Sequence, residues 1–139
     1  VLMGAVDTVD DARGVAVAGD YAYVIHDINA MCSLRVIDVS DREAPAVVAT
    51  ADPPGDARDI VVAGDYAYVA DGRGLHVVDV SSPTEPIGFV SFNTPGITRG
   101  VAIGDGLACV VRDWAGMAVF RFGGPGVRDG SSGRVRTQP

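Results

Sequence analysis

The stretch from Arg58 to Asn93 reads RDIVVAGDYAYVADGRGLHVVDVSSPTEPIGFVSFN, and it contains four short apolar runs separated by residues typical of turns. The first two runs are joined by Gly64-Asp65, a two-residue loop whose glycine can adopt the positive φ that a tight hairpin requires. Pro83 and Pro86 cannot donate to a strand ladder, so they mark the gap before the fourth run. The stretch therefore predicts a small antiparallel sheet of four strands.

The same unit occurs on both sides of this stretch. An earlier copy begins at Arg13 with RGVAVAGDYAYV and continues at Leu34 with LRVIDVS, and a more divergent copy begins at Arg99 with RGVAIGDGLACV and continues at Met117 with MAVFRF. The matching arginines are 45 and then 41 residues apart. Repeats of about 40 residues with four strands each are typical of β-propeller blades.

The two ends of the chain are predicted to complement each other. Residues 1–12, VLMGAVDTVDDA, resemble Ile87 to Thr98, which suggests the outer strand of a preceding blade, whereas the third copy has no fourth run after Phe122. The tail GGPGVRDGSSGRVRTQP has no apolar pattern and is expected to be disordered or a linker. The expected organisation is an outer strand at 1–12, blade 1 at 13–57, blade 2 at 58–98, an incomplete blade 3 at 99–122 and the tail at 123–139.

The strands alternate in side-chain size more than in polarity. Val15 and Val17 point to one face, and Ala16 and Ala18 point to the other. Sheets with one face in water alternate polar and apolar residues, so these strands indicate a sheet that is covered on both faces. This favours an all-β fold of radially stacked propeller blades over a β-sandwich, in which each sheet is usually covered on one face only.

The strings LRVID and LHVVD, with DYAYVAD before and DVSSPTEP after the second, resemble the LVIVD repeat. The resemblance extends over residues 1 to about 122 and is weaker in the third copy, where Phe120-Arg121 replaces the Val-Asp pair and Cys109 replaces Tyr68. It implies a four-stranded propeller blade and a location at the cell surface of bacteria or archaea. It brings no catalytic residues.

Composition narrows the classes of partner. The chain is 47% hydrophobic, it contains no lysine, and its net charge is −7. The tail contributes about +2, so the repeats are more acidic still, which argues against nucleic-acid binding. No apolar run approaches the roughly 20 residues of a membrane-spanning helix.

Strand register yields one candidate site. If Gly64-Asp65 forms the turn, Ala63 pairs with Tyr66, and counting back places Arg58 opposite Asp71. The same count places Arg13 opposite His26, with Asp27 beside it, and it applies to the third copy as well, so these positions are expected to gather near the mouth of a central channel. The predicted ligand-binding residues are Arg13, His26, Arg58, Asp71, Arg99, Arg112, Asp113 and Trp114.

A purely structural role is the alternative for each of these residues. An arginine can pair with a local aspartate, and a loop tryptophan can cover the edge of a blade instead of contacting a ligand. Arg99 is expected opposite Arg112, and because like charges in that position are unfavourable, the pair needs Asp113 or an external anion.

Metal and cofactor sites are not expected. His26 and His76 lie in different strand environments without ligand spacing. Cys32 and Cys109 belong to blades that are not neighbours, so two free thiols are expected rather than a disulfide.

The favoured function is a non-enzymatic repeat module at the cell surface that binds a protein or a glycan through its loop face. The alternative is a fragment of a propeller enzyme of the hydrolase, lyase or lactonase type, with its site at the channel mouth or in missing blades. Three blades leave two apolar faces bare, so the chain is expected either to be part of a longer propeller or to form a homodimer of six blades in which N-terminal strands are exchanged.

Overall fold

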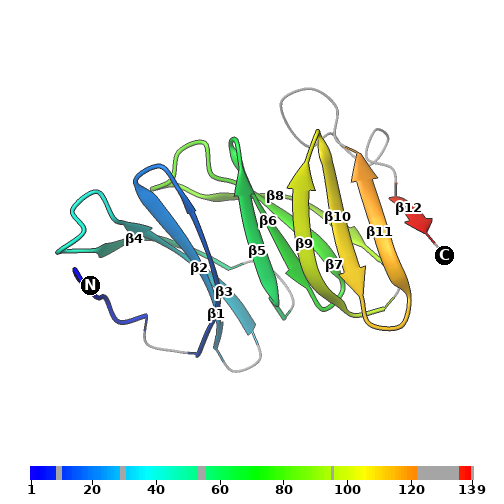
Figure 1. The fold of residues 1–139 in the computed structure, drawn as a ribbon, viewed down its shortest axis with the longest axis horizontal. Coiled ribbons are helices and arrows are strands. Elements are labelled where there is room, and N and C mark those ends of the chain that lie inside the picture. Colours follow the sequence, from blue (N-terminus) through cyan, green and yellow to red (C-terminus); the bar gives the residue numbers. More distant parts are fainter. Residues whose placement is uncertain (9–10, 29–30, 53–55, 95, 122–134, 139) are drawn as a thin grey trace.

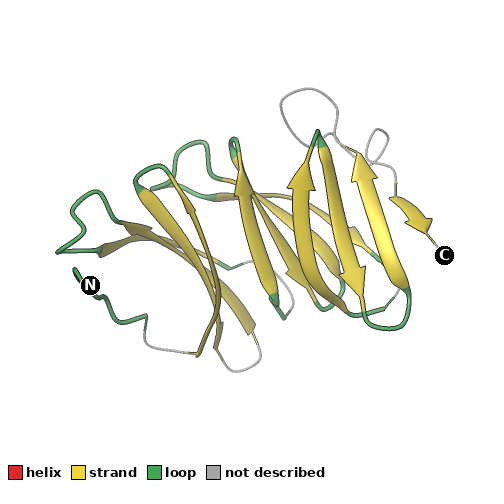
Figure 2. Cartoon of the chain, viewed as in Figure 1, coloured by secondary structure: helices red, strands yellow, loops and turns green. Residues whose placement is uncertain are grey.

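The computed structural model describes residues 1–8, 11–28, 31–52, 56–94, 96–121 and 135–138, and over these ranges it consists of β-strands and loops (Figure 2). No helix that could cross a membrane occurs in those ranges.

The strands form three antiparallel sheets that follow one another along the chain and lie side by side (Figure 1). Sheet 1 consists of β1 (Asp11–Ala18), β2 (Tyr21–Ile28), β3 (Met31–Asp38) and β4 (Ala46–Ala51). Sheet 2 consists of β5 (Asp59–Ala63), β6 (Tyr66–Asp71), β7 (Gly74–Asp79) and β8 (Ile87–Asn93). Sheet 3 consists of β9 (Thr98–Gly104), β10 (Leu107–Arg112), β11 (Gly116–Arg121) and β12 (Val135–Gln138). The prediction of four-stranded propeller-type blades is confirmed.

The first hairpin of each sheet turns at the predicted position. Gly19 and Gly64 have φ values of 60° and 59°, and Ala63 pairs with Tyr66 as expected. In sheet 3 both turn residues have positive φ, 52° at Asp105 and 73° at Gly106, which is the conformation of a type I′ turn. These turns fix the register of each inner pair of strands.

Apolar side chains fill the spaces between neighbouring sheets. One core cluster joins sheet 1 to sheet 2, and it includes Tyr23 and Val69, both of them buried. A second joins sheet 2 to sheet 3, where the rings of Phe92 and Phe120 are 5.0 Å apart between centroids. Sheet 2 is therefore covered on both faces, as the absence of polar alternation predicted.

The two faces of β1 have different surroundings, so the prediction that the strand is covered on both faces is wrong for β1 in the single chain. Ala16 and Ala18 pack against the cluster between sheets 1 and 2, whereas Val15 and Val17 point away from sheet 2 and are 62% and 67% exposed. The face of sheet 1 that points away from sheet 2 is therefore open at Val15 and Val17, whereas Ala22, Val24 and Ile37 on the same face are buried.

The innermost strands β1, β5 and β9 adjoin one another along the arc of sheets (Figure 1). Asp59 connects two of them, because its Oδ2 accepts a hydrogen bond of 3.0 Å from the backbone N–H of Val101 while its Oδ1 accepts one of 2.9 Å from Ile60. The equivalent residue of β1 is Gly14, so the junction of sheets 1 and 2 lacks this carboxylate.

The ends of the chain differ from the sequence prediction. Residues 1–8 contain no strand, and β1 begins at Asp11, so 1–12 is not an outer strand in the single chain. Blade 3 is not incomplete, because β12 from the predicted disordered tail pairs antiparallel with β11. An unpaired strand edge carries unsatisfied backbone N–H and C=O groups, and β12 satisfies them on β11. Residues 122–134 lie outside the described ranges.

The contact between Phe92 and Phe120 predicts a large stability effect. Phe120 is fully buried, so Phe120→Ala is expected to lower the free energy of unfolding by about 3–5 kcal/mol, because it removes apolar contacts and leaves a cavity between sheets 2 and 3. Urea unfolding followed by circular dichroism measures this change. Ile87→Ala is the control, since Ile87 is 64% exposed on the outer strand β8 and its loss is expected to change stability by no more than about 0.5 kcal/mol. Equal effects of the two variants would contradict the packing described.

Candidate functional site

A β-bulge recurs where the first strand of a sheet begins. In sheet 1 the register shifts between Ala12 and Gly14, which leaves Arg13 without a partner in the ladder. In sheet 3, Gly100 pairs with Val111 and Thr98 pairs with Arg112, so Arg99 is the extra residue. Bulges redirect side chains and commonly lie beside functional sites.

The corresponding arginine of sheet 2 has a related backbone arrangement. The N–H of Arg58 donates to the carbonyl oxygen of Ala70 at 2.7 Å, although Ala70 is already the partner of Asp59. Arg58 therefore does not lie opposite Asp71, and the expected pairings of Arg13 with His26 and of Arg99 with Arg112 are also wrong. In sheets 1 and 3, the extra residue in the first strand shifts each pairing by one position.

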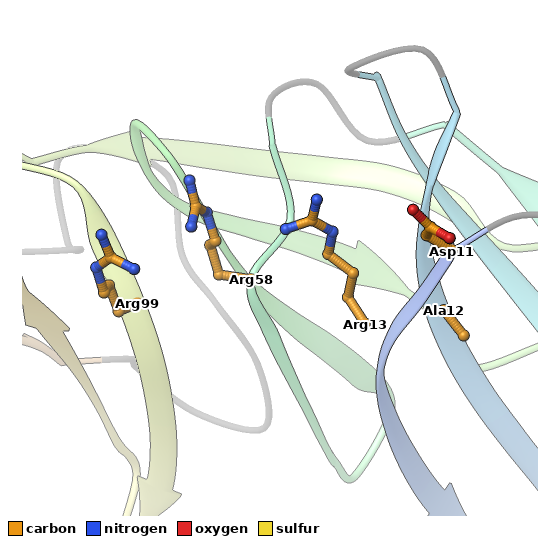
Figure 3. A pocket seen from close by; sticks show the side chains of 5 residues that line it. All are labelled: Asp11, Ala12, Arg13, Arg58 and Arg99. Carbon is orange, nitrogen blue, oxygen red and sulfur yellow. The ribbon is translucent and has the colours of Figure 1, made fainter.

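The equivalent arginines of the three repeats line one pocket. Arg13, Arg58 and Arg99 come from three consecutive sheets and surround a cavity of about 630 Å³, together with Asp11 and Ala12. Figure 3 shows the three guanidinium groups side by side, near the ends at which the innermost strands begin. Three of the eight predicted site residues therefore meet at one place.

Each of these arginines is paired with an aspartate. Arg13 Nη2 lies 2.8 Å from Asp27 Oδ2, and Arg99 binds Asp113 through Nε and through Nη2, the latter at 3.1 Å. Both aspartates follow their arginine by 14 residues.

The middle repeat obtains its carboxylate from a different position. Gly72 stands where the other repeats have Asp27 and Asp113, and Arg58 Nη2 instead lies 2.8 Å from Asp56 Oδ2. The pairing is thus kept in all three repeats although its geometry differs in one.

The ion pairs hold the charges of this pocket in place. The hydrogen bonds from Arg99 keep the pKa of Asp113 below its ordinary value, and the nearby positive charge of Arg58 acts in the same direction. The bond to Asp113 raises the pKa of Arg99 in turn. The pocket therefore carries both hydrogen-bond donors and hydrogen-bond acceptors, and it is not a simple cationic patch.

Trp114 projects from a loop fixed beside Arg99. The Trp114 side chain is 79% exposed, and the preceding Asp113 donates its N–H to the carbonyl oxygen of Ile97 at 3.0 Å. Arg112 is buried and donates to the carbonyl oxygens of Ala115 and Gly116. Arg112 thus supports the loop, whereas Trp114 faces solvent.

The remaining predicted site residues lie in the interior. His26 is 1% exposed and does not line the pocket. Asp71 is also buried, and its Oδ1 accepts hydrogen bonds from the backbone N–H groups of Arg73 at 2.7 Å and Gly74 at 2.9 Å. These bonds close the loop between β6 and β7, so Asp71 has a structural role.

Sequence reasoning missed the partner of Arg58 and two residues that line the pocket. The register count places Asp27 beside His26, and a local aspartate is the structural alternative for each arginine, but the count does not identify Asp56. It also does not place Asp11 or Ala12 in the pocket. The 14-residue spacing from Arg13 to Asp27 and from Arg99 to Asp113 was the available signal, because a hairpin of that length returns the chain to the same edge.

Residues suited to metal binding do not cluster in the part of the chain that the structure describes, where no group of three or more histidine, cysteine, aspartate or glutamate side chains converges. Cys109 is a free thiol, and the side chain of Cys32 lies outside the described part.

The burial of Asp71 predicts a pH-dependent effect. Burial raises the pKa of Asp71 despite its two backbone hydrogen bonds, so the folded state holds the proton more tightly than the unfolded state does. The contribution of this group to stability is then greatest below its ordinary pKa of 3.8 and is lost as pH rises through the folded pKa.

Asp71→Asn cannot ionise, and its amide oxygen can still accept both hydrogen bonds. The stability of this variant relative to the wild-type chain is expected to increase between about pH 3 and pH 7, which urea unfolding at several pH values measures. Asp71→Ala, which loses both bonds, is expected to be less stable at every pH. A difference between Asp71→Asn and the wild-type chain that does not change with pH would contradict the assignment.

Comparison with known proteins agrees with the repeat structure. The model of the LVIVD repeat family matches residues 10–52 and 54–94, which together make up more than half of the chain. No curated protein matches the sequence. The two matched segments contain Arg13 and Arg58 together with the first two sheets, and on this match the chain belongs to the LVIVD repeat family.

Proposed function

We propose that this β-propeller repeat module acts without catalysis as a binding scaffold at the cell surface and that it recognises a glycan at the mouth formed by Arg13, Arg58 and Arg99. The observation that carries the proposal is the convergence of three arginines from three consecutive sheets on one polar pocket. Convergent polar groups in a concave site are typical of a ligand-binding site.

The chemistry of the mouth favours a ligand rich in hydroxyl groups. Each guanidinium has five N–H donors, whereas the ion pairs engage one nitrogen of Arg13, one of Arg58 and two of Arg99. The paired carboxylates add acceptors next to these donors. A sugar hydroxyl both donates and accepts, so it suits such a surface better than a polyanion does.

The exposed tryptophan provides an apolar surface beside these polar groups. Trp114 directly follows Asp113, the partner of Arg99, and its ring is largely open to solvent. An aromatic ring can cover the apolar face of a sugar while the arginines bind its hydroxyls, and exposed aromatics of this kind commonly anchor ligands.

A panel of immobilised neutral and acidic oligosaccharides tests the proposal. The wild-type chain is expected to bind a defined subset of the panel, and Arg58→Gln or Trp114→Ala is expected to weaken that binding by about tenfold or more, equivalent to about 1.4 kcal/mol. Arg42→Gln is the control, since Arg42 is exposed on the turn between β3 and β4, outside the pocket.

Binding of no oligosaccharide would contradict the choice of ligand. Equal binding by Arg58→Gln and the wild-type chain would contradict the choice of site. The proposed location is tested separately by antibody labelling of intact cells, in which staining without permeabilisation is expected.

A further inference from the structure

The open face of sheet 1 is equivalent to faces that are buried in the other two sheets. It consists of Val15 and Val17, which are exposed, and of Ala22, Val24 and Ile37, which are buried in a small cluster with Val6 and Val39. The equivalent residues of sheet 2 are Ile60, Val62, Ala67, Val69 and Val78, and they pack against sheet 1. The equivalent residues of sheet 3 are Val101, Ile103, Ala108, Val110 and Phe120, and they pack against sheet 2. By position, the open face of sheet 1 is therefore a docking face for a preceding sheet.

Sheet 3 carries the complementary open face. It consists of Ala102, Leu107, Cys109, Val111, Met117 and Val119, none of which is buried. The equivalent residues of sheet 1 are Ala16, Tyr21, Tyr23, Ile25, Leu34 and Val36, and all of them belong to or pack against the core cluster between sheets 1 and 2. One chain thus bears both halves of a contact that it already makes twice internally.

The N-terminal segment marks where a preceding sheet belongs. Val6 packs against the cluster that contains Ile37, and in the repeat alignment these two residues correspond to Phe92 and Phe120. Phe92 lies on β8, the outer strand of sheet 2, and it packs on Phe120 of sheet 3. Val6 therefore occupies the place of an outer strand, and the inner part of the face is open.

A pocket lies over the part of this face that is formed by β1 and β2. A cavity of about 440 Å³ lies over the face and is lined by residues that include Val6, Val15 and Val24. Isolated apolar side chains on a surface need no explanation, but Val15 and Val17 are neighbours on one face, and their equivalents Ile60 and Val62 pack against another sheet, which marks an interaction surface.

We propose that the occupant is a second copy of this chain, whose sheet 3 docks onto sheet 1 of the first, and that two such contacts close a ring of six blades. Propellers commonly contain four to eight blades. Val111 of one copy then faces Val15 of the other, because their equivalents Ile25 and Ile60 share one core cluster. This inference concerns the two end faces and does not depend on the proposed ligand.

The N-terminal segment must move aside when the second copy docks, because β12 of that copy takes the same place. The contacts described for the segment include the packing of Val6 and a 2.8 Å hydrogen bond from Arg35 Nη1 to the carbonyl oxygen of Thr8. The six apolar residues of the docked sheet 3 replace the contacts that the N-terminal segment loses. The dimer therefore does not require the two copies to swap their N-terminal strands.

Light scattering on the full 139-residue chain tests the proposal. A dimer of twice the 14.3 kDa chain mass is expected. Val15→Asp and Val111→Asp are each expected to raise the dissociation constant by about a hundredfold or more, because an unpaired carboxylate would be buried in the contact. Both side chains are exposed in the single chain, so its fold is expected to tolerate either change.

Two further arms make the test specific. Ile87→Asp, on an outer strand away from both faces, is the matched control and is expected to remain dimeric. Mixing Val15→Arg with Val111→Asp is expected to restore a mixed dimer, since the two charges then face each other. A wild-type monomer, an open-ended oligomer or equal disruption by Ile87→Asp would overturn the proposal.

Discussion

The packing of one apolar sheet face on another is the interaction on which this structure depends. The first three strands of each sheet carry apolar residues on both faces, so a single sheet of this sequence would expose one or both apolar faces to water. Both apolar faces of sheet 2 are shielded from water, because sheet 1 covers one of them and sheet 3 covers the other. The arrangement of the chain as an arc, and the exposure of its two end faces, both follow from this requirement.

Stacking the sheets also creates the candidate site. An arginine at the same position of each repeat would be an isolated surface charge in a single blade. Because the innermost strands adjoin, Arg13, Arg58 and Arg99 are brought to one pocket although more than 40 residues separate each from the next. The site is thus a property of the repeat array and not of any one repeat.

The sequence was sufficient for the four-stranded sheet of the middle repeat, for the hairpin turns and for the division of the β1 side chains between two faces. These features depend on local turn chemistry and on a period of two residues. The sequence was not sufficient for the pairing of Arg13 and Arg99. A bulge adds one residue to a strand without a distinct local signature, so a count from the turn places each arginine opposite the wrong partner. The strand β12 was missed for a different reason. The residues VRTQ have no apolar pattern, and their strand conformation comes from the free edge of β11.

The hydrogen bonds of Asp59 make the junction between sheets 2 and 3 different in its contacts from the junction between sheets 1 and 2. Between sheets 2 and 3, a carboxylate joins backbone groups of both innermost strands, so separating these sheets must break a hydrogen bond to a charged group as well as apolar contacts. Between sheets 1 and 2, Gly14 stands at the equivalent position, and this carboxylate clamp is absent. Separation of sheets 1 and 2 at this position therefore breaks one charge-assisted hydrogen bond fewer than separation of sheets 2 and 3, although both junctions lie beside the same three arginines.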